Sequence, residues 1–432
     1  MKRLLAILAL ALLAAPAAAR LAPAEQEIVR IVESEQDRNI ALLERLVNQN
    51  SGSLNFPGVE AVGRMIRAEL EPLGFAVRWV PMAEAGRAGH IVAAHKGSGR
   101  GRRMLLIGHL DTVFEPDSAF RHFTRKDENT VEGPGIGDNK GGMVVMVAAL
   151  RAMKAAGTLA DADVEIVLTG DEEDSGSPVA LARRDLVAAA GRADVALDFE
   201  GLAREGGLDM GSIARRGTAS WQLTTKGRTG HSSTVFSPSM GDGAVYEMAR
   251  ILAAFRSELP EPNLTFNVGL VVGGATAGLD RDLIRGTATG KTNIVPPVAI
   301  ARGDLRALSL DQQKRVIARM HEIVGRHLPG TGAELAFDEG GYPPMAPTAA
   351  SRALLARLNS VNRDLGLAEM GEFDPLKRGA GDIGFVAHLV PGLVGLGTAG
   401  EGAHAPGETV ELDSIPRQAK RAAILMTRLS RP

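Results

Sequence analysis

The sequence contains no cysteine, which excludes disulfide bridges, thiolate metal ligands and a cysteine for lipid attachment. Any metal site must therefore be built from histidine and carboxylate side chains. A surplus of charge is also missing, because 49 basic and 51 acidic residues leave a net charge of −2 without long single-sign runs. This balance lacks the electrostatic footprint of nucleic-acid binding, so we expect no nucleic acid among the partners.

Long apolar segments are scarce as well, and the one clear run lies at the N-terminus. The segment "MKRLLAILALALLAAPAAAR" combines a basic start, an apolar run over residues 4–15 and the small residues 17–19. This pattern predicts a signal peptide over residues 1–19 that is cleaved before Arg20. The alternative is a membrane anchor, but about a dozen apolar residues are too few to span a bilayer. We expect a secreted protein without a membrane partner after cleavage, and the lack of cysteine fits a bacterial periplasm.

What the sequence does contain is a regular alternation of strand-like and helical segments. Two helical patterns at 25–53 and 58–75 are followed by apolar runs at 76–82, 90–97, 103–110, 163–170 and 194–200, with helical patterns at 140–157 and 177–191 between them. Continuous apolar strands between helices predict an α/β domain with a mostly parallel, two-sided sheet. The length of 432 residues exceeds what one core usually serves, so two domains are expected.

The middle of the chain has a different character. Strand patterns at 218–228, 263–274, 296–308 and 333–341 enclose helical patterns at 241–259 and 311–328. The order β-α-β-β-α-β predicts a small α+β domain with two helices on one face. Helix–strand alternation resumes beyond residue 343. We therefore predict a catalytic domain over 20–213 and 331–432, interrupted by an inserted domain over 214–330.

Ionisable residues follow the predicted strands, at the edge where open α/β sheets bind ligands. His109 and Asp111 follow "LLIG" and are two residues apart, so they can act as a ligand and its orienting carboxylate. The other candidates are Asp138 in "GPGIGDNKGG", Asp171, Glu172 and Glu173 in "LTGDEEDSG", Asp198 and Glu200 in "ALDFEG", and His404 in "GTAGEGAHAPGE".

Each candidate alone also has an ordinary explanation, as a strand-end polar residue, a helix cap or a solvated acidic turn. Their combination favours a hydrolytic zinc site, since two histidines and several carboxylates are the ligands available without cysteine. Divalent cations would also relieve the repulsion between clustered carboxylates. Of the adjacent Glu172 and Glu173, one can bind metal while the other stays free as the general base. A carboxylate at Asp138 could bridge two metal ions.

Six motifs in order carry a resemblance to a known family. "GHLDTV", "GPGIGDNKGG", "TGDEEDSGS", "DFEG", "GHSS" and "GAHAPGE" resemble those of the M20 metallopeptidases, and most of all the glutamate carboxypeptidase (carboxypeptidase G) branch. The resemblance spans nearly all of the chain after the signal peptide and implies two Zn²⁺ per subunit. Its implied ligands are His109 and Glu200 for one zinc, Glu173 and His404 for the other, and Asp138 as the bridge. Asp198 remains a rival of Glu200.

The resemblance also implies the remaining roles. Glu172 would be the general base, and Asp111 would fix the ring of His109. The inserted domain would act as a lid and dimerisation domain, and thus predicts a homodimer in which His231 of "TGHSS" stabilises the oxyanion in the partner's site. Asn293, Arg306 and Gly381 match substrate-binding positions.

In two places the sequence departs from the family pattern. The glutamate-preferring members carry an arginine after the last strand of the inserted domain, whereas this chain has "DEGGYPPMAP" without one. Arg215 and Arg216 are cationic candidates for a different substrate group. The segment "TAGLDRDLIRGTATGKTN" also looks longer than the usual turn.

Together these features predict a di-zinc metallohydrolase that cleaves an amide or peptide bond next to a C-terminal amino acid, in a small peptide or N-acyl amino acid. An aminoacylase or dipeptidase of the same family is the alternative within the enzymes. From other classes, an inactive peptide-binding relative would lack a ligand or the base, and neither is missing here. A periplasmic solute-binding protein would not need two histidines plus carboxylates at strand ends.

Overall fold

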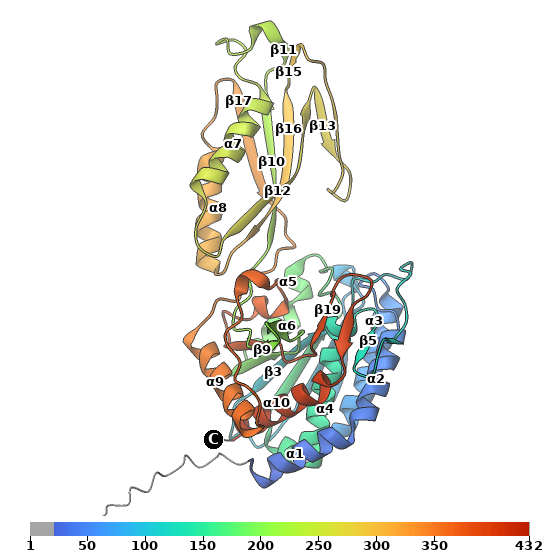
Figure 1. Ribbon diagram of the computed structural model, residues 1–432. Coiled ribbons are helices and arrows are strands. Elements are labelled where there is room, and N and C mark those ends of the chain that lie inside the picture. Colours follow the sequence, from blue (N-terminus) through green and yellow to red (C-terminus); the bar gives the residue numbers. More distant parts are fainter. Residues whose placement is uncertain (1–20, 432) are drawn as a thin grey trace, which may run out of the picture.

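A computed structural model describes residues 21–431 of the chain. The predicted signal peptide lies outside these residues. Figure 1 shows a large lower body built from both ends of the chain and a smaller elongated body above it. Among the described residues, no helix has the length and apolar character needed to cross a membrane.

The large body contains a six-stranded sheet in the order β1-β2-β6-β3-β7-β18. Neighbours among β6, β3, β7 and β18 are parallel, which confirms the mostly parallel sheet. β2 is antiparallel to both of its neighbours, because the short connection after β1 allows only a return in the opposite direction. The strands are β1 (Ala76–Pro81), β2 (Gly89–His95), β3 (Met104–His109), β6 (Val164–Thr169), β7 (Val195–Asp198) and β18 (Gly392–Val394).

Helices cover both faces of this sheet. α4 (Gly142–Ala155) is the most deeply buried, and only Lys154 and Ala155 in it escape full burial. The first predicted helix is two helices that meet at Glu35. The other helices are α1 (Pro23–Ser34), α2 (Gln36–Asn48), α3 (Phe56–Leu70), α5 (Val179–Ala182), α6 (Arg184–Ala190), α9 (Ala349–Asp364) and α10 (Ser414–Leu429).

β3 is the strand that places the first candidate ligand. All six of its residues are buried. Leu106 belongs to the core on one face of the sheet, whereas Leu105 and Ile107 belong to the core on the other. Each such side chain stabilises the fold by about 1.5–3 kcal/mol through its burial, so the strand end that carries His109 is firmly held.

The small body is the predicted α+β domain. Its sheet has the order β12-β16-β10-β17, with every neighbouring pair antiparallel, and α7 and α8 lie on one face (Figure 1). The observed order β10 (Ala219–Gly227), α7 (Ala244–Glu258), β12 (Thr265–Gly274), β16 (Val298–Arg306), α8 (Leu310–Val324) and β17 (Thr331–Phe337) is β-α-β-β-α-β. Because β17 pairs with β10, the domain extends beyond residue 330, where the sequence placed its end.

Short strand pairs complete the fold. β13 (Thr276–Leu279) and β14 (Gly286–Thr289) form a hairpin from the segment that is longer than the family turn. β11 (Gly230–His231) pairs with β15 (Ile294–Val295) at the end of the small domain remote from the large one (Figure 1). In the large domain, β4 (Thr124–Arg125), β5 (Thr130–Glu132), β19 (Gly400–Glu401) and β20 (Thr409–Glu411) form one small sheet, and β8 (Ala203–Glu205) pairs with β9 (Leu208–Met210).

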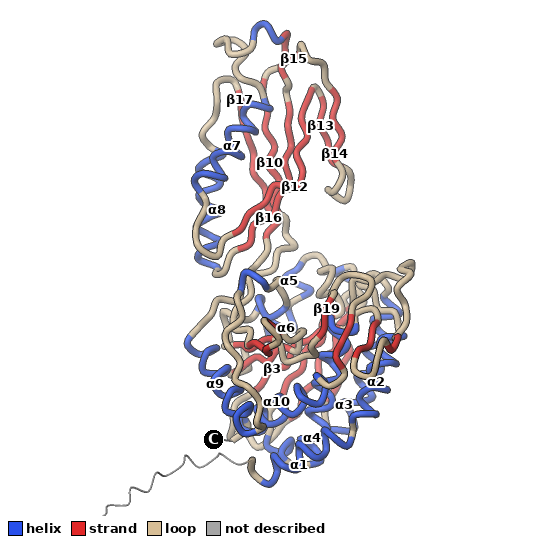
Figure 2. Tube along the Cα trace, viewed as in Figure 1, coloured by secondary structure: helices blue, strands red, loops and turns tan. Residues whose placement is uncertain are grey.

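Two linkers, residues 214–218 and 342–345, join the domains and can be followed in Figure 2. They run antiparallel and hydrogen-bond to each other. The Thr218 N–H donates to the Tyr342 carbonyl at 2.8 Å, and Arg215 and Met345 exchange two main-chain bonds of 3.0 and 2.9 Å. The linkers therefore form one paired element between the domains.

Candidate metal centre

The first group of ligand atoms forms where β3 and β7 end side by side. His109 Nε2 lies 2.9 Å from an oxygen of Asp138 and 3.2 Å from an oxygen of Glu200. His109 is buried at the strand tip, whereas Asp138 comes from the glycine-rich loop before α4. Three residues that are far apart in the sequence thus present ligand atoms to a common point.

The second group shares Asp138 with the first. The other oxygen of Asp138 lies 3.0 Å from His404 Nε2, and an oxygen of Glu173 lies 3.1 Å from the same nitrogen. Within each group all ligand atoms lie within 4.8 Å of one another. Asp138 therefore directs one oxygen toward each histidine, as a bridging carboxylate must.

The donor set fits two divalent cations. It consists of two imidazoles and three carboxylates, a set that Zn²⁺ accepts in the absence of thiolates. One oxygen of Glu173 is buried and has no hydrogen-bond partner among residues 21–431. Burial raises the pKa of Glu173 to about 7, and hydrogen bonds to Asp138 and Glu173 raise the pKa of His404 to about 11. Bound cations would take the place of these protons.

Asp111 ties the end of β3 to the turn that carries the acidic pair. Its carboxylate accepts hydrogen bonds from the Ser53 hydroxyl at 2.6 Å and from the backbone N–H groups of Glu172 and Glu173 at 3.0 and 3.1 Å. His109 Nδ1 lies 3.1 Å from the Asp111 carbonyl oxygen and 3.4 Å from its carboxylate. Asp111 thus orients both the ring and the turn, and its carbonyl makes the shorter contact with the ring.

Glu172 stands beside the cluster without joining either ligand group. Desolvation by burial, opposed by the nearby His109, raises the pKa of its carboxyl well above the ordinary value. Asp198 also belongs to neither group: one of its oxygens accepts the Glu200 N–H at 3.2 Å, and the other is buried without a partner in the described chain. Of the two rivals, Glu200 is therefore the residue that lies against His109.

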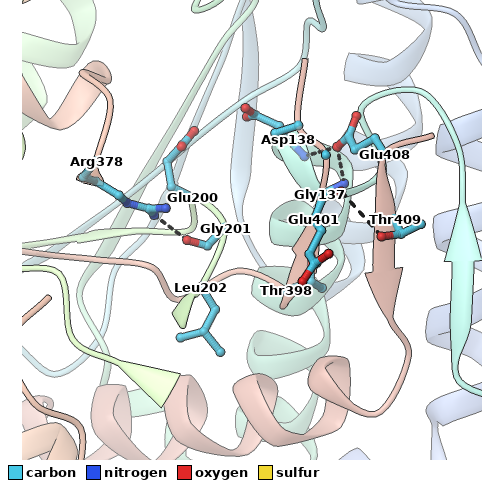
Figure 3. A pocket seen from close by; sticks show the side chains of 13 residues that line it. Gly137, Asp138, Glu200, Gly201, Leu202, Arg378, Thr398, Glu401, Glu408 and Thr409 are labelled. Atoms are coloured by element: carbon cyan, nitrogen blue, oxygen red, sulfur yellow. Dashed lines mark hydrogen bonds between the residues drawn. The ribbon is translucent and has the colours of Figure 1, made fainter. Parts of the chain in front are cut away.

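Glu408 holds the loop of the bridging carboxylate, a task that the sequence did not indicate. Its carboxylate accepts the backbone N–H group of Gly135 at 2.9 Å. It also accepts those of Gly137 and Asp138 at 2.7 and 2.9 Å (Figure 3). Burial raises its pKa to about 7, although these three bonds favour the charged form. The available signal was an acidic residue four positions after His404 in a glycine-rich segment.

Arg378 is a second residue that the sequence did not single out. It lines a cleft of about 160 Å³ together with Asp138, Glu200 and Thr398 (Figure 3). Its guanidinium donates to the Gly201 carbonyl, and its Nε is buried without a partner within the described residues. Burial lowers its pKa to about 10, so it stays charged at neutral pH.

Arg215 and Arg216 were expected as candidates for a substrate group, but both side chains contact other parts of the protein. Arg215 lies 3.2 Å from Glu200, on the oxygen remote from His109, and donates to the Gly379 carbonyl at 2.7 Å. Arg216 donates to the Thr265 hydroxyl at 2.5 Å and to the Leu376 carbonyl at 3.1 Å. The two arginines thus support the ligand Glu200 and the domain junction.

The remaining predicted site residues are spread over the molecule. His231 and Asn293 lie together at the remote end of the small domain, where the Ser232 N–H donates to the Asn293 carbonyl at 2.9 Å (Figure 1). Arg306 ends β16 and donates to Asp304 at 2.9 Å. Gly381 faces Arg215 so closely that a side chain there would collide with the guanidinium. Within one chain, His231 and Asn293 do not meet the metal cluster.

Comparisons with known proteins agree with this geometry. Carboxypeptidase G2 of Pseudomonas sp. (strain RS-16) is 27% identical over 98% of this chain and 96% of its own. Succinyl-diaminopimelate desuccinylase of Novosphingobium aromaticivorans is 30% identical over 67% of this chain and 73% of its own. A dinuclear metal-binding peptidase of the M20 family from Bacillus subtilis has a TM-score of 0.62 at 15% identity, covering 92% of this chain and 98% of that one.

The family model decides the assignment. The model for peptidase family M20/M25/M40 matches residues 105–428, which include all five proposed ligands. The match confirms the resemblance that the six motifs indicated, and with it the metallohydrolase activity and the two-domain α/β fold. The chain belongs to peptidase family M20/M25/M40.

Proposed function

We propose that the protein is an exported di-zinc hydrolase that removes a C-terminal amino acid from a small peptide or N-acyl amino acid by cleaving an amide bond. The observation that carries this proposal is the shared carboxylate: Asp138 directs one oxygen to each of two histidine-containing ligand groups. Similarity to carboxypeptidase G2 over almost the full length supports the carboxypeptidase-type reaction.

The residues of the cluster would act as metal ligands and as the general base. His109, Asp138 and Glu200 would hold one zinc, and Asp138, Glu173 and His404 would hold the other. Bound there, the two ions supply Lewis-acid activation of water and of the scissile carbonyl. Glu172, the free neighbour of Glu173, takes the proton from the attacking water and delivers it to the leaving amine.

The carboxylate of the substrate needs a cation. Arg378 lines the cleft next to Asp138 and Glu200. Within the described part of the chain it has a single hydrogen-bond acceptor, the Gly201 carbonyl, so it is available for such a group. It is a better candidate than Arg215, whose charge is paired with Glu200. Arg306, Asn293 and Gly381 remain proposed substrate contacts.

The homodimer is part of the proposal because His231 lies far from the cluster of its own chain. Apolar side chains gather near it on the small domain: Phe236, Val245, Tyr246 and Val271 are 59%, 42%, 55% and 48% exposed. Phe236 and Tyr246 pack together with ring centroids 5.3 Å apart, and β12 is an edge strand. A second copy on this surface would cover it and bring His231 to the partner's oxyanion.

Mixed dimers test this arrangement. Glu172→Ala and His231→Ala are each expected to be inactive as homodimers. Co-expression should restore activity to heterodimers, in which one active site combines an intact Glu172 with an intact His231 from the other chain. Absence of any recovery in a purified heterodimer would rule out the contribution across the interface.

Export rests on the N-terminal segment alone. Expression of the full chain in a Gram-negative host, followed by fractionation and N-terminal sequencing, should yield a periplasmic protein that begins at Arg20. An unprocessed chain retained with the cytoplasm would contradict the proposal.

The reaction itself is tested with zinc-loaded protein and a panel of N-acyl amino acids, dipeptides and folate-like conjugates. Release of the C-terminal amino acid from folate-like conjugates supports the carboxypeptidase, whereas activity on simple N-acyl amino acids alone would favour an aminoacylase. Hydrolysis restricted to dipeptides or to succinylated amines would favour the alternative, for which the 30% identity to a desuccinylase is the specific support. No hydrolysis of any amide would refute the proposed function.

A further inference from the structure

The linker that returns from the small domain carries Tyr342, in the segment where the family arginine is absent. Its hydroxyl lies at the base of the turn that carries Glu172 and Glu173. The hydroxyl donates to the main-chain carbonyl of Glu172, accepts from Arg183 Nη2 at 3.0 Å and lies 2.8 Å from the Ser175 hydroxyl. One linker side chain thus contacts the main chain of the proposed base.

The partner Arg183 is itself rigidly held inside the large domain. It is 1% exposed and pairs with Asp171 at 2.6 Å and with Asp382 at 2.7 Å. Its guanidinium lies 5.3 Å from the ring centre of Phe385, which in turn packs edge-on against Tyr342 at 5.1 Å. Tyr342 therefore contacts the rigidly held Arg183 on one side and hydrogen-bonds to the catalytic turn on the other.

The position of Tyr342 also depends on the small domain. The Tyr342 carbonyl accepts the N–H of Thr218 on the other linker at 2.8 Å. The Tyr342 N–H donates to the hydroxyl of Thr218 at 3.4 Å. The next residue pair, Arg215 and Met345, continues the ladder. This paired element joins the two domains, so we expect a change in the placement of the small domain to reach Tyr342 through it.

On the opposite side, the N–H groups of Glu172 and Glu173 donate to Asp111. Arginine side chains hold the carbonyls of the neighbouring turn residues Asp171, Asp174 and Ser175. The bond from Tyr342 fixes the carbonyl of Glu172 itself. We propose that Tyr342 is a positioning residue that couples the placement of the small domain to the turn carrying Glu172. This inference rests on the proposed function, in which Glu172 is the base. Among the described residues, the Tyr342 hydroxyl bonds to the Glu172 main chain, Arg183 and Ser175, none of which is a proposed metal ligand side chain.

Tyr342→Phe removes the hydroxyl and keeps the ring that packs on Phe385. Ser34→Ala is the control, because it removes an exposed hydroxyl that likewise donates to a main-chain carbonyl, that of Ile31 in α1. We expect Tyr342→Phe to lower kcat about tenfold, the effect of one lost hydrogen bond, with KM changed less than about twofold and zinc content unchanged. Ser34→Ala should match the parent protein.

Hydrogen exchange on the zinc-loaded protein gives a readout that does not depend on activity. In Tyr342→Phe the amides of residues 170–177 should exchange faster, while those of β10 and β16 keep the parental rates. Parental kcat together with parental exchange would overturn the inference. Faster exchange throughout the protein, or loss of zinc, would also overturn it, because the tyrosine would then serve general stability. An inactive parent protein would refute the proposed function, and the exchange comparison would still decide the role of Tyr342.

Discussion

Replacing Glu408 by glutamine should damage the metal centre from a distance, because within residues 21–431 the Glu408 side chain hydrogen-bonds to the backbone of the Asp138 loop and not to a proposed ligand side chain. Its carboxylate accepts three N–H groups, two on one oxygen and one on the other. Glutamine keeps one acceptor oxygen, and its amide group faces the third N–H as a second donor. The variant thus loses one bond outright and weakens two.

The magnitude follows from these bonds. Hydrogen bonds to a charged acceptor contribute about 1.5–3 kcal/mol each, and neutral ones about 1 kcal/mol. The loss of one charged bond and the weakening of two, offset in part by the smaller cost of burying a neutral group, gives about 2–4 kcal/mol in the free energy of unfolding. Because the loop places the bridging carboxylate, metal affinity should fall about 10–100-fold.

Urea unfolding of the metal-free protein and competition with a chelator measure these two quantities. Glu401→Gln is a matched control, since Glu401 lines the same cleft, is exposed, and loses the same charge. Equal unfolding free energies and equal metal affinities of Glu408→Gln and Glu401→Gln would contradict the proposed role of Glu408. A drop in metal affinity without a change in the free energy of unfolding would mean that the Asp138 loop rearranges around the glutamine side chain.

The other predictions concern the cluster and the cleft. Glu172→Ala should keep two zincs per chain, by elemental analysis, and lose turnover by orders of magnitude; parental turnover would disprove its role as the base. His404→Ala should retain one zinc per chain because Asp138 and Glu173 alone cannot complete the second group, and retention of two would exclude this ligand. Arg378→Gln should raise KM about tenfold for substrates with a carboxylate next to the scissile bond, and leave KM for their amidated analogues unchanged. An equal effect on both substrates would show that Arg378 does not recognise the carboxylate.

The sequence was sufficient to indicate the ligand candidates because their placement is a local consequence of strand geometry. His109 lies at the end of an apolar strand, and Glu173 and Glu200 follow two further strands of the same sheet. Parallel neighbours bring such ends to one edge, so the candidates could be grouped without knowing a single contact. The resemblance favoured Glu200 over Asp198, and the structure brings Glu200 rather than Asp198 into the group with His109.

The supporting residues were not predictable in this way, because their roles depend on contacts that no local pattern encodes. Glu408 hydrogen-bonds to a loop some 270 positions earlier in the chain. Arg215, which the sequence offered as a candidate for a substrate group, pairs instead with the proposed metal ligand Glu200. The sequence pattern assigned the strand at 333–341 to the small domain, but the boundary drawn at residue 330 left it out. The pairing of β17 with β10 places this strand in the small domain.

The domain junction shows why the absence of the family arginine after the last small-domain strand does not leave that segment without a role. An arginine there would present charge to a substrate, whereas Tyr342 turns inward to the main chain of Glu172 and to Arg183. The charge of Arg183 is already balanced by Asp171 and Asp382, so the tyrosine adds a neutral hydrogen-bonding group to a closed ionic network. The cation proposed for the substrate carboxylate is instead Arg378, which lines the cleft and comes from the large domain. Recognition of the substrate carboxylate and placement of the base are thus assigned to different segments, and separate substitutions can test them.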